Sequence, residues 1–220
     1  MVNQISESEA GSYGVLVNSF HELEPAYCEH YRKDKAERGN TASIGKHECL
    51  RWLDLKEPNS VLYICFGSLL EFPAAQLRGW APQVLILDHN AVGGFMTHCG
   101  WNSTLEAVTA GVPLVTWPLY AEQFDNEKLI TDVLKIGIGV GALEWSRYPK
   151  KILVRKDDME KAIVQLMVGE EAEEIRNRAR ELQEMARNAM EEGGSSYSDL
   201  TALLEELRAL ETSKRESAAH

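Results

Sequence analysis

The feature that most constrains the fold is a strand, loop, helix and strand pattern within residues 80–123. Residues 92–97 are a short apolar run typical of a buried strand, residues 104–110 follow a helical pattern, and residues 112–117 and 121–134 repeat this pair. Strands that alternate with helices at this spacing pair in parallel through right-handed crossovers. The pattern therefore predicts an α/β fold with a doubly wound parallel sheet.

Similar elements are predicted on both sides of this stretch. Short apolar runs predict further strands at residues 13–18, 61–66 and 136–140. Helical patterns predict a short helix at 49–53, a helix from Lys156, an acidic helix at 170–192 that ends at Gly193-Gly194, and a last helix at 197–210. Residues 212–220 are expected to fray.

Composition and charge exclude several kinds of partner. The net charge of -11 argues against nucleic acid or an anionic membrane, because either would bind a basic face. No apolar run approaches the roughly 18 residues of a membrane span, and residues 1–12 lack a signal-peptide pattern. The four cysteines show no CxxC spacing, and no acidic or histidine cluster has metal-ligand spacing. We expect a cytoplasmic protein with reduced thiols and no metal.

An anion site is predicted where residues 92–97 end in the sequence HCGWNST. A helix is expected to begin there, with Asn102, Ser103 or Thr104 as its N-cap. The amide groups at a helix N-terminus carry about half a positive charge and bind phosphate. Gly100 would let the backbone approach closely, and His98 could add a hydrogen bond, or a charge if protonated. A histidine at this place could equally be a core residue.

Polar and aromatic residues around this site suggest a nucleotide sugar. Trp80, in a proline-containing turn, could stack on a base, and Glu106 could accept from ribose hydroxyls. Glu122 and Gln123 suit the paired hydroxyls of a hexose, and Ser68 follows the strand predicted at 61–66. Each also has a plain alternative, such as a buried tryptophan, a carboxylate at a helix N-terminus, or a solvated helix start.

The sequence of residues 80–123 resembles the secondary-product glycosyltransferase box of plant family 1 UDP-dependent glycosyltransferases. WAPQ opens the stretch, HCGWNS lies in its middle and EQ closes it, without a gap. The resemblance continues in YGVLVNSFHELEP, HECLRWLD, NSVLYICFGS and EEGGSSYSDL, so it covers nearly the whole chain. It is strongest to the group that glucosylates flavonoids and other small phenolics or terpenoids.

The resemblance implies a role for each polar position of the box. The uracil and ribose would contact Trp80, Ala81, Gln83 and Glu106. The pyrophosphate would contact Ser68, His98, Asn102 and Ser103. The sugar would contact Trp101, Glu122 and Gln123, and a glutamine at the last place is associated with glucose over galactose. The family has the GT-B fold, inverts the sugar, uses UDP-glucose as donor substrate and needs no metal or other cofactor.

The resemblance also implies that parts of the family pattern are missing. In the family, an N-terminal domain supplies the acceptor pocket and a catalytic histidine, and none of His21, His30 or His47 stands in a similar segment. We therefore assign no catalytic residue. Near Arg78 the family carries a further helix and two strands, so an internal deletion is expected there, leaving an unpaired edge beside residues 61–66.

These comparisons with the family pattern set the expected domains. Residues 1–33 would be a remnant of the acceptor domain, 34–47 a linker, 48–193 the UDP-sugar donor domain, and 194–220 a C-terminal helix and tail. The predicted fold class is thus the C-terminal, Rossmann-like half of a GT-B fold, without most of the N-terminal domain and about two donor-domain strands.

Three functions remain open at this point. The chain could be a UDP-glucose-dependent glucosyltransferase of small hydroxylated acceptors, a catalytically inactive module that binds UDP-sugar, or a truncated product without function. Family resemblance favours the first for the complete protein. The missing base and acceptor pocket favour the second or third for this polypeptide acting alone.

Overall fold

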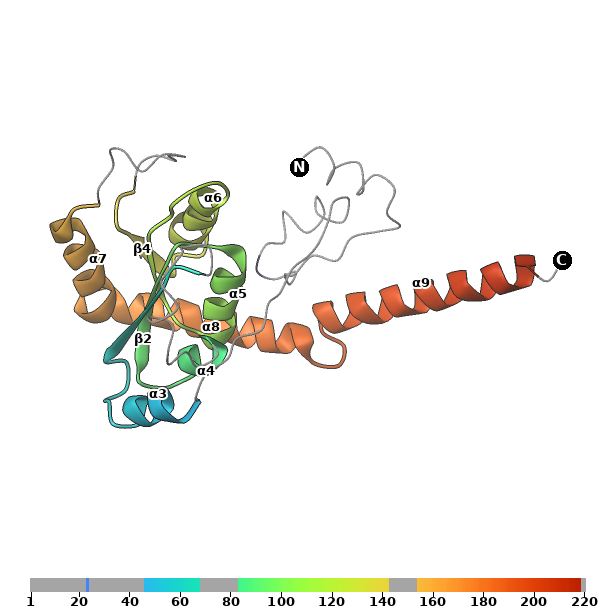
Figure 1. The fold of residues 1–220 in the computed structure, drawn as a ribbon, viewed down its shortest axis with the longest axis horizontal. Helices are drawn as coiled ribbons and strands as arrows, with labels where there is room; N and C mark the ends of the chain where they lie inside the picture. The colour runs from blue at the N-terminus through green and yellow to red at the C-terminus, as the bar shows by residue number, and fades with distance from the viewer. Residues whose placement is uncertain (1–22, 24–45, 68–82, 143–153, 219–220) are drawn as a thin grey trace. The chain divides into compact units, whose positions relative to one another are not determined.

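The computed structural model describes residue 23 and residues 46–67, 83–142 and 154–218 (Figure 1). Residues 41–184 form one compact unit, which contains the sheet, and α9 (Ser195–Ala218) belongs to a second unit. The elements predicted at 13–18 and the deletion predicted near Arg78 lie outside the described residues, so both stay predictions.

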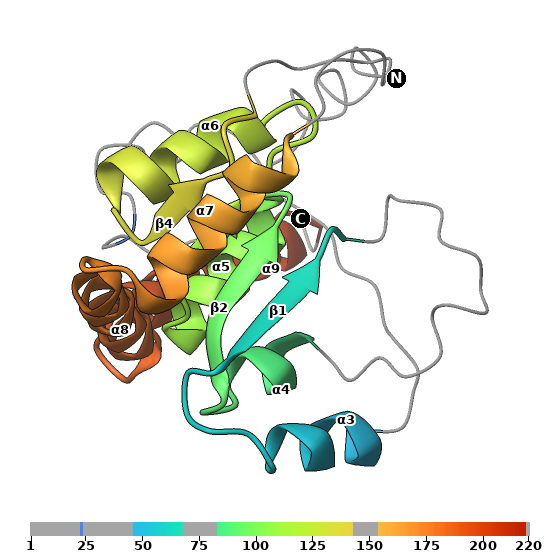
Figure 2. The ribbon, with the colours of Figure 1, turned by 90° about the vertical axis from the view of Figure 1, so that its left-hand side faces the viewer.

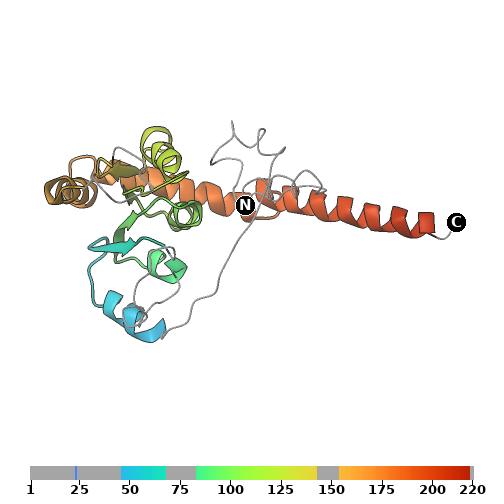
Figure 3. The same ribbon diagram turned by 45° about the horizontal axis from the view of Figure 1, so that its top comes forward.

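Four parallel strands form the sheet in the order β1-β2-β3-β4. Figures 2 and 3 show the ribbon from two further sides. They are β1 (Val61–Cys65), β2 (Val92–Thr97), β3 (Leu114–Thr116) and β4 (Gly137–Gly139). The parallel α/β sheet is confirmed, with β3 and β4 shorter than the apolar runs that predicted them. The strands end in register, with their last residues in one row. The loops that follow them therefore meet at the carboxyl ends of the strands.

Helices cover both faces of this sheet (Figure 2). The connecting helices are α4 (Gln83–Leu87), α5 (Trp101–Ala110) and α6 (Gln123–Lys128). Because the strands follow one another in sequence order, right-handed crossovers bring these helices to the same face. The other face is covered by α7 (Lys156–Val168), whose Ala162 and Leu166 pack with Met96 of β2 and Val115 of β3.

Helix α3 (Lys46–Leu53) and most of helix α8 (Ala172–Met190) also belong to the sheet unit. In α3, Leu53 is buried, as the apolar spacing of that segment predicts. The long helix α8 buries Ala172, Ile175, Ala179 and Leu182, which recur at helical spacing along one stripe. Among the helices described, none combines the length and apolar composition that crossing a membrane requires.

Several predicted boundaries were wrong. The short helix α4 was not anticipated, and the single helix expected at 121–134 is α6 followed by a π-helical turn, η1 (Leu129–Val133). Helix α9 continues to Ala218, although residues 212–220 were expected to fray. That part of the sequence has no glycine or proline to end a helix, and its Lys, Arg and Glu residues are good helix formers.

Candidate functional site

His98 lies among the loops at the carboxyl ends of the strands. It follows β2 directly, and its side chain is 8% exposed. A Cβ atom added to Gly67 would come within 2.8 Å of the imidazole Cε1, and one added to Gly100 within 2.6 Å of Nε2. A side chain at either position would therefore displace the imidazole. Two backbone segments, one after β1 and one after β2, hold the ring between them.

The electrostatic surroundings of His98 favour its neutral form. Burial lowers the pKa of the imidazole, and the negative charge of Glu122 acts in the opposite direction. Thr97 Oγ1 lies 3.3 Å from His98 Nδ1, which leaves Nε2 as the nitrogen available to a ligand. At neutral pH His98 would therefore contribute a hydrogen bond to an anion rather than a positive charge. The influence of Glu122 also shows that the loops after β2 and β3 approach each other.

Helix α5 begins beside His98, and its N-cap residue, Gly100, has no side chain that could cap it. Gly100 is in extended conformation, and the first helical hydrogen bond runs from Thr104 N to Gly100 O over 3.0 Å. The prediction of Asn102, Ser103 or Thr104 as N-cap was wrong, because Gly100 allows the helix to start at Trp101. The partial positive charge of the helix N-terminus thus lies at the carboxyl ends of the strands, beside His98.

Gln83, Ser103 and Glu106 form a polar cluster between α4 and α5. Gln83 Nε2 donates to Ser103 Oγ over 3.2 Å, and a hydrogen bond from Gln83 also reaches the Glu106 carboxylate. Burial raises the pKa of Glu106, while the bond from Gln83 opposes this shift. The residues predicted to contact ribose, Gln83 and Glu106, are therefore neighbours in space. Ser103, predicted to contact the pyrophosphate, is bonded to Gln83 although the two are 20 positions apart in sequence.

Gln123 and Glu122 differ in their surroundings. Gln123 is 2% exposed, and its Oε1 accepts hydrogen bonds from the backbone amides of Leu119 and Tyr120 over 2.9 and 3.1 Å. This oxygen shapes the loop between β3 and α6, so only the Nε2 amide could contact a sugar. Glu122 is exposed.

The remaining predicted contacts fall into two groups. Trp101, half-buried, and Asn102, exposed, lie in the first turn of α5, and each already interacts with other groups of the chain. Ser68, Trp80 and Ala81 lie outside the described residues, so their roles stay predictions. Within the described residues, no three His, Cys, Asp or Glu side chains are grouped so that they could hold a metal ion.

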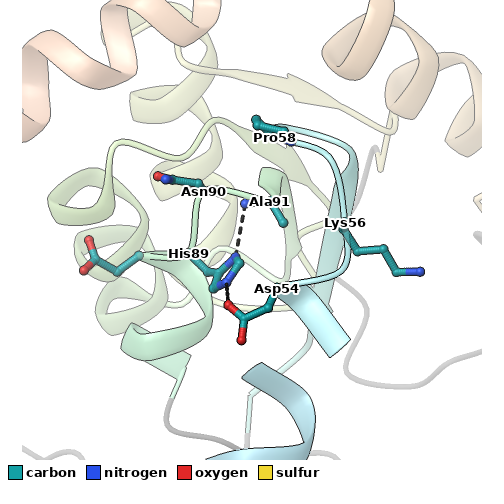
Figure 4. A pocket seen from close by; sticks show the side chains of 7 residues that line it. Asp54, Lys56, Pro58, His89, Asn90 and Ala91 are labelled. Carbon is teal, nitrogen blue, oxygen red and sulfur yellow. Dashed lines mark hydrogen bonds and ion pairs between the residues drawn. The ribbon is translucent and has the colours of Figure 1, made fainter. Parts of the chain in front are cut away.

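A separate cavity of about 370 Å³ lies at the amino ends of the strands, before β1 and β2 (Figure 4). In it, His89 Nδ1 accepts from the Ala91 amide over 3.2 Å, so Nε2 carries the proton that faces Asp54 Oδ1, also at 3.2 Å. These bonds join the two loops that lead into the strands. Because the cavity is at the amino ends of the strands, it is distinct from the His98 site.

Comparison with known proteins shows which family the sequence resembles. The family described as "UDP-glucoronosyl and UDP-glucosyl transferase" matches residues 67–174, which include all of the described site. A scopoletin glucosyltransferase of Nicotiana tabacum is 47% identical over 270 residues, covering 94% of this chain and 56% of the relative. An anthocyanin 3'-O-beta-glucosyltransferase of Gentiana triflora is 45% identical, covering 94% and 57%.

Solved structures show the same relationship. Glycyrrhiza uralensis UGT73P12, complexed with glycyrrhetinic acid 3-O-monoglucuronide, superimposes with a TM-score of 0.85 at 36% identity, covering 98% of this chain and 58% of that one. Phytolacca americana UGT2, complexed with UDP-2fluoro-glucose and pterostilbene, superimposes with a TM-score of 0.71 at 30% identity, covering 89% and 53%. The sheet described above is thus part of a GT-B fold.

These matches cover nearly all of this chain, but the chain spans about half the length of the curated relatives that it matches. In the tobacco alignment, 94% of 220 residues is about 207, so about 60 of the 270 aligned positions have no counterpart here. The family match, the sequence identities and the shared fold together show that the chain belongs to the plant family 1 UDP-dependent glycosyltransferases.

Proposed function

We propose that this chain binds the UDP moiety of UDP-glucose where β1, β2 and β3 end. The observation that carries the proposal is the N-terminus of α5, whose N-cap residue is Gly100, beside an imidazole held between Gly67 and Gly100. Such a site offers hydrogen-bond donors and a positive dipole to a pyrophosphate without any lysine or arginine. Relatives solved with UDP or a UDP-sugar support the choice of ligand.

The other parts of the donor are assigned from the neighbouring residues. Gln83 and Glu106 would exchange their mutual hydrogen bond for bonds to the ribose hydroxyls. Glu122 would accept from sugar hydroxyls, and the Gln123 Nε2 amide would donate to one. Trp80, Ala81 and Ser68 would complete the site at the uracil and the pyrophosphate. The donor would bind without a metal or a resident cofactor.

The activity of the complete protein would be transfer of glucose from UDP-glucose to a hydroxyl of a small acceptor. The acceptor would be a phenolic or terpenoid compound in the cytoplasm, and relatives named as scopoletin, anthocyanin and flavonoid glucosyltransferases support the phenolic class. Transfer also needs a base that removes the acceptor proton, and we assign none here. For the chain acting alone we therefore favour UDP-sugar binding without transfer.

Calorimetric titration with UDP and an assay of UDP release from UDP-glucose, with and without a flavonol, test the proposal. Saturable binding of UDP without flavonol-dependent turnover is the expected result. Formation of a flavonol glucoside at a steady rate would show instead that the chain contains a base that we have not identified. Absence of UDP binding by a chain with an intact near-UV spectrum would refute the donor site. Absence of binding together with a lost near-UV spectrum would favour a non-functional product.

A further inference from the structure

The loop that carries His98 contains an unfavourable backbone conformation. Cys99, between His98 and Gly100, has a φ of 65°, in the left-handed region that residues other than glycine seldom occupy. Its side chain is 0% exposed, and burial raises the pKa of its thiol, so the thiol is unreactive at neutral pH. A conformation of this kind persists only where neighbouring groups hold it in place.

One side chain from a distant part of the sequence holds this turn. Asn126 Nδ2 donates a hydrogen bond of 2.8 Å to the backbone carbonyl oxygen of Cys99, 27 positions earlier. Asn126 lies in α6, three residues beyond the end of the glycosyltransferase box at Gln123. The bond therefore joins α6, which begins at Gln123, to the loop that precedes α5.

Glu127, the residue after Asn126, anchors α6 to the sheet. Thr116 Oγ1, at the end of β3, donates to Glu127 Oε1 over 2.7 Å. In the same helix, the Asn126 backbone amide donates to Glu122 O over 2.9 Å. Consecutive side chains thus tie α6 to β3 and to the Cys99 turn. The sugar end of the site, at Glu122 and Gln123, and the phosphate end, at His98, are connected through Asn126.

We propose that Asn126 is a positioning residue of the donor site. By holding the Cys99 carbonyl, its amide keeps the turn in the left-handed conformation that directs the His98 ring and the N-terminus of α5 toward the pyrophosphate. Asn126 itself does not contact the donor. The inference rests on the proposed UDP site and adds to it a residue outside the recognised box.

Substitutions that differ only in the donor group test this role. Asn126→Asp keeps the shape but replaces the NH2 donor with a carboxylate, and Asn126→Leu removes hydrogen bonding altogether. We expect both variants of the full chain to bind UDP at least tenfold more weakly than the wild type at pH 7.5. At pH 5 the carboxyl group introduced by Asn126→Asp can take up a proton and donate it to the Cys99 carbonyl. Asn126→Asp should therefore recover most of its affinity at pH 5, and Asn126→Leu should not.

Each affinity is divided by that of the wild type at the same pH. This removes the contributions of UDP ionisation and of the neighbouring groups His98, Glu122 and Glu127, which all variants share. Thr131→Val is the matched control, because it removes a hydroxyl that bonds within the same helical segment, to Glu127 O, without contacting the Cys99 turn. The control should bind UDP as the wild type does.

A measurement without ligand separates this inference from the proposed function. NMR titration of the His98 ring should give a pKa below the ordinary value in the wild type and a pKa closer to that value in Asn126→Leu, since a released turn exposes the ring. If the wild type does not bind UDP, the UDP site fails, and this titration still tests the positioning role. An unchanged His98 titration in Asn126→Leu would overturn the inference.

Two further results would also overturn it. One is UDP affinity in both Asn126 variants within twofold of the wild type. The other is loss of the near-UV spectrum in both variants, because a positioning role requires a folded chain in which the site alone is altered. Recovery of Asn126→Leu at pH 5 to the same degree as Asn126→Asp would likewise exclude the hydrogen bond as the cause.

Discussion

Strands β1 and β2 are hydrogen-bonded neighbours, yet they have different surroundings. All six residues of β2 are buried, and β2 has a partner on each side. Among the described residues β1 pairs with β2 only, and its Ile64 is 54% exposed. The centre of the candidate donor site, which follows β2, thus lies in a complete setting. In the part of the chain that the structure describes, the outer edge of β1 has no partner strand.

The largest expected effect tests whether β2 carries the stability of the sheet. Phe95 is 0% exposed and stacks on Tyr63 of β1 with ring centroids 5.1 Å apart. Phe95→Ala should lower the free energy of unfolding by about 3 to 5 kcal/mol, because it leaves a cavity in the core. The control Ile64→Thr, on exposed β1 surface, should change it by about 0.5 kcal/mol or less. Similar losses in both, by urea denaturation, would remove the contrast between the strands.

The next effect compares the carboxyl ends of the strands with their amino ends. His98→Ala and Glu106→Ala should each weaken UDP binding by about 1 to 3 kcal/mol, the usual cost of removing a partner from a charged hydrogen bond. His89→Ala is the control, because His89 lies at the amino ends of the strands and is bonded to Asp54. Calorimetry should find its UDP affinity unchanged. Unchanged affinity in both site variants would contradict the residue assignment.

A smaller effect concerns the anchor of α6 on β3. Burial raises the pKa of Glu127, while its bond from Thr116 lowers it. The folded chain then binds this proton more tightly than the unfolded chain, so stability falls as the pH rises from the ordinary pKa of 4.5 through the folded value. Glu127→Gln cannot ionise and can still accept from Thr116. It should be more stable than the wild type at pH 7, by less than about 1 kcal/mol because solvent screens a half-buried charge.

The advantage of Glu127→Gln should shrink as the pH falls below the ordinary pKa of 4.5, where the wild-type carboxyl becomes protonated in both states. Thermal unfolding at several pH values measures this difference. An advantage that stays constant with pH would show that packing, and not ionisation, separates the two proteins.

The smallest expected change in folding free energy belongs to the edge itself. Ile64→Lys places a charge on an exposed edge strand, which natural proteins use to prevent pairing between sheets. We expect little change in the free energy of unfolding and a clear fall in self-association by light scattering at high protein concentration. Equal association in both proteins would show that the edge of β1 is covered by other residues.

Much of the fold could be predicted because it depends on short-range pattern. The apolar runs of β1 and β2 and the helical spacing of α7 and α8 each occupy one continuous segment. The box between residues 80 and 123 predicted that His98, Ser103 and Glu106 belong to one site. In the structure Gln83 bonds to both Ser103 and Glu106, so these two are neighbours, and their shared role in binding stays a prediction.

What the sequence by itself determined is the parallel α/β pattern, the glycosyltransferase box and hence the family, since each is written in the order of residues along the chain. Only the tertiary structure decided that Gly67 and Gly100 enclose His98, that Gln123 shapes its own loop, and that Asn126 holds Cys99. The bonds and contacts at His98 and Cys99 join segments far apart in sequence. Their partners are selected by how the strand ends pack together, and no local pattern records that packing.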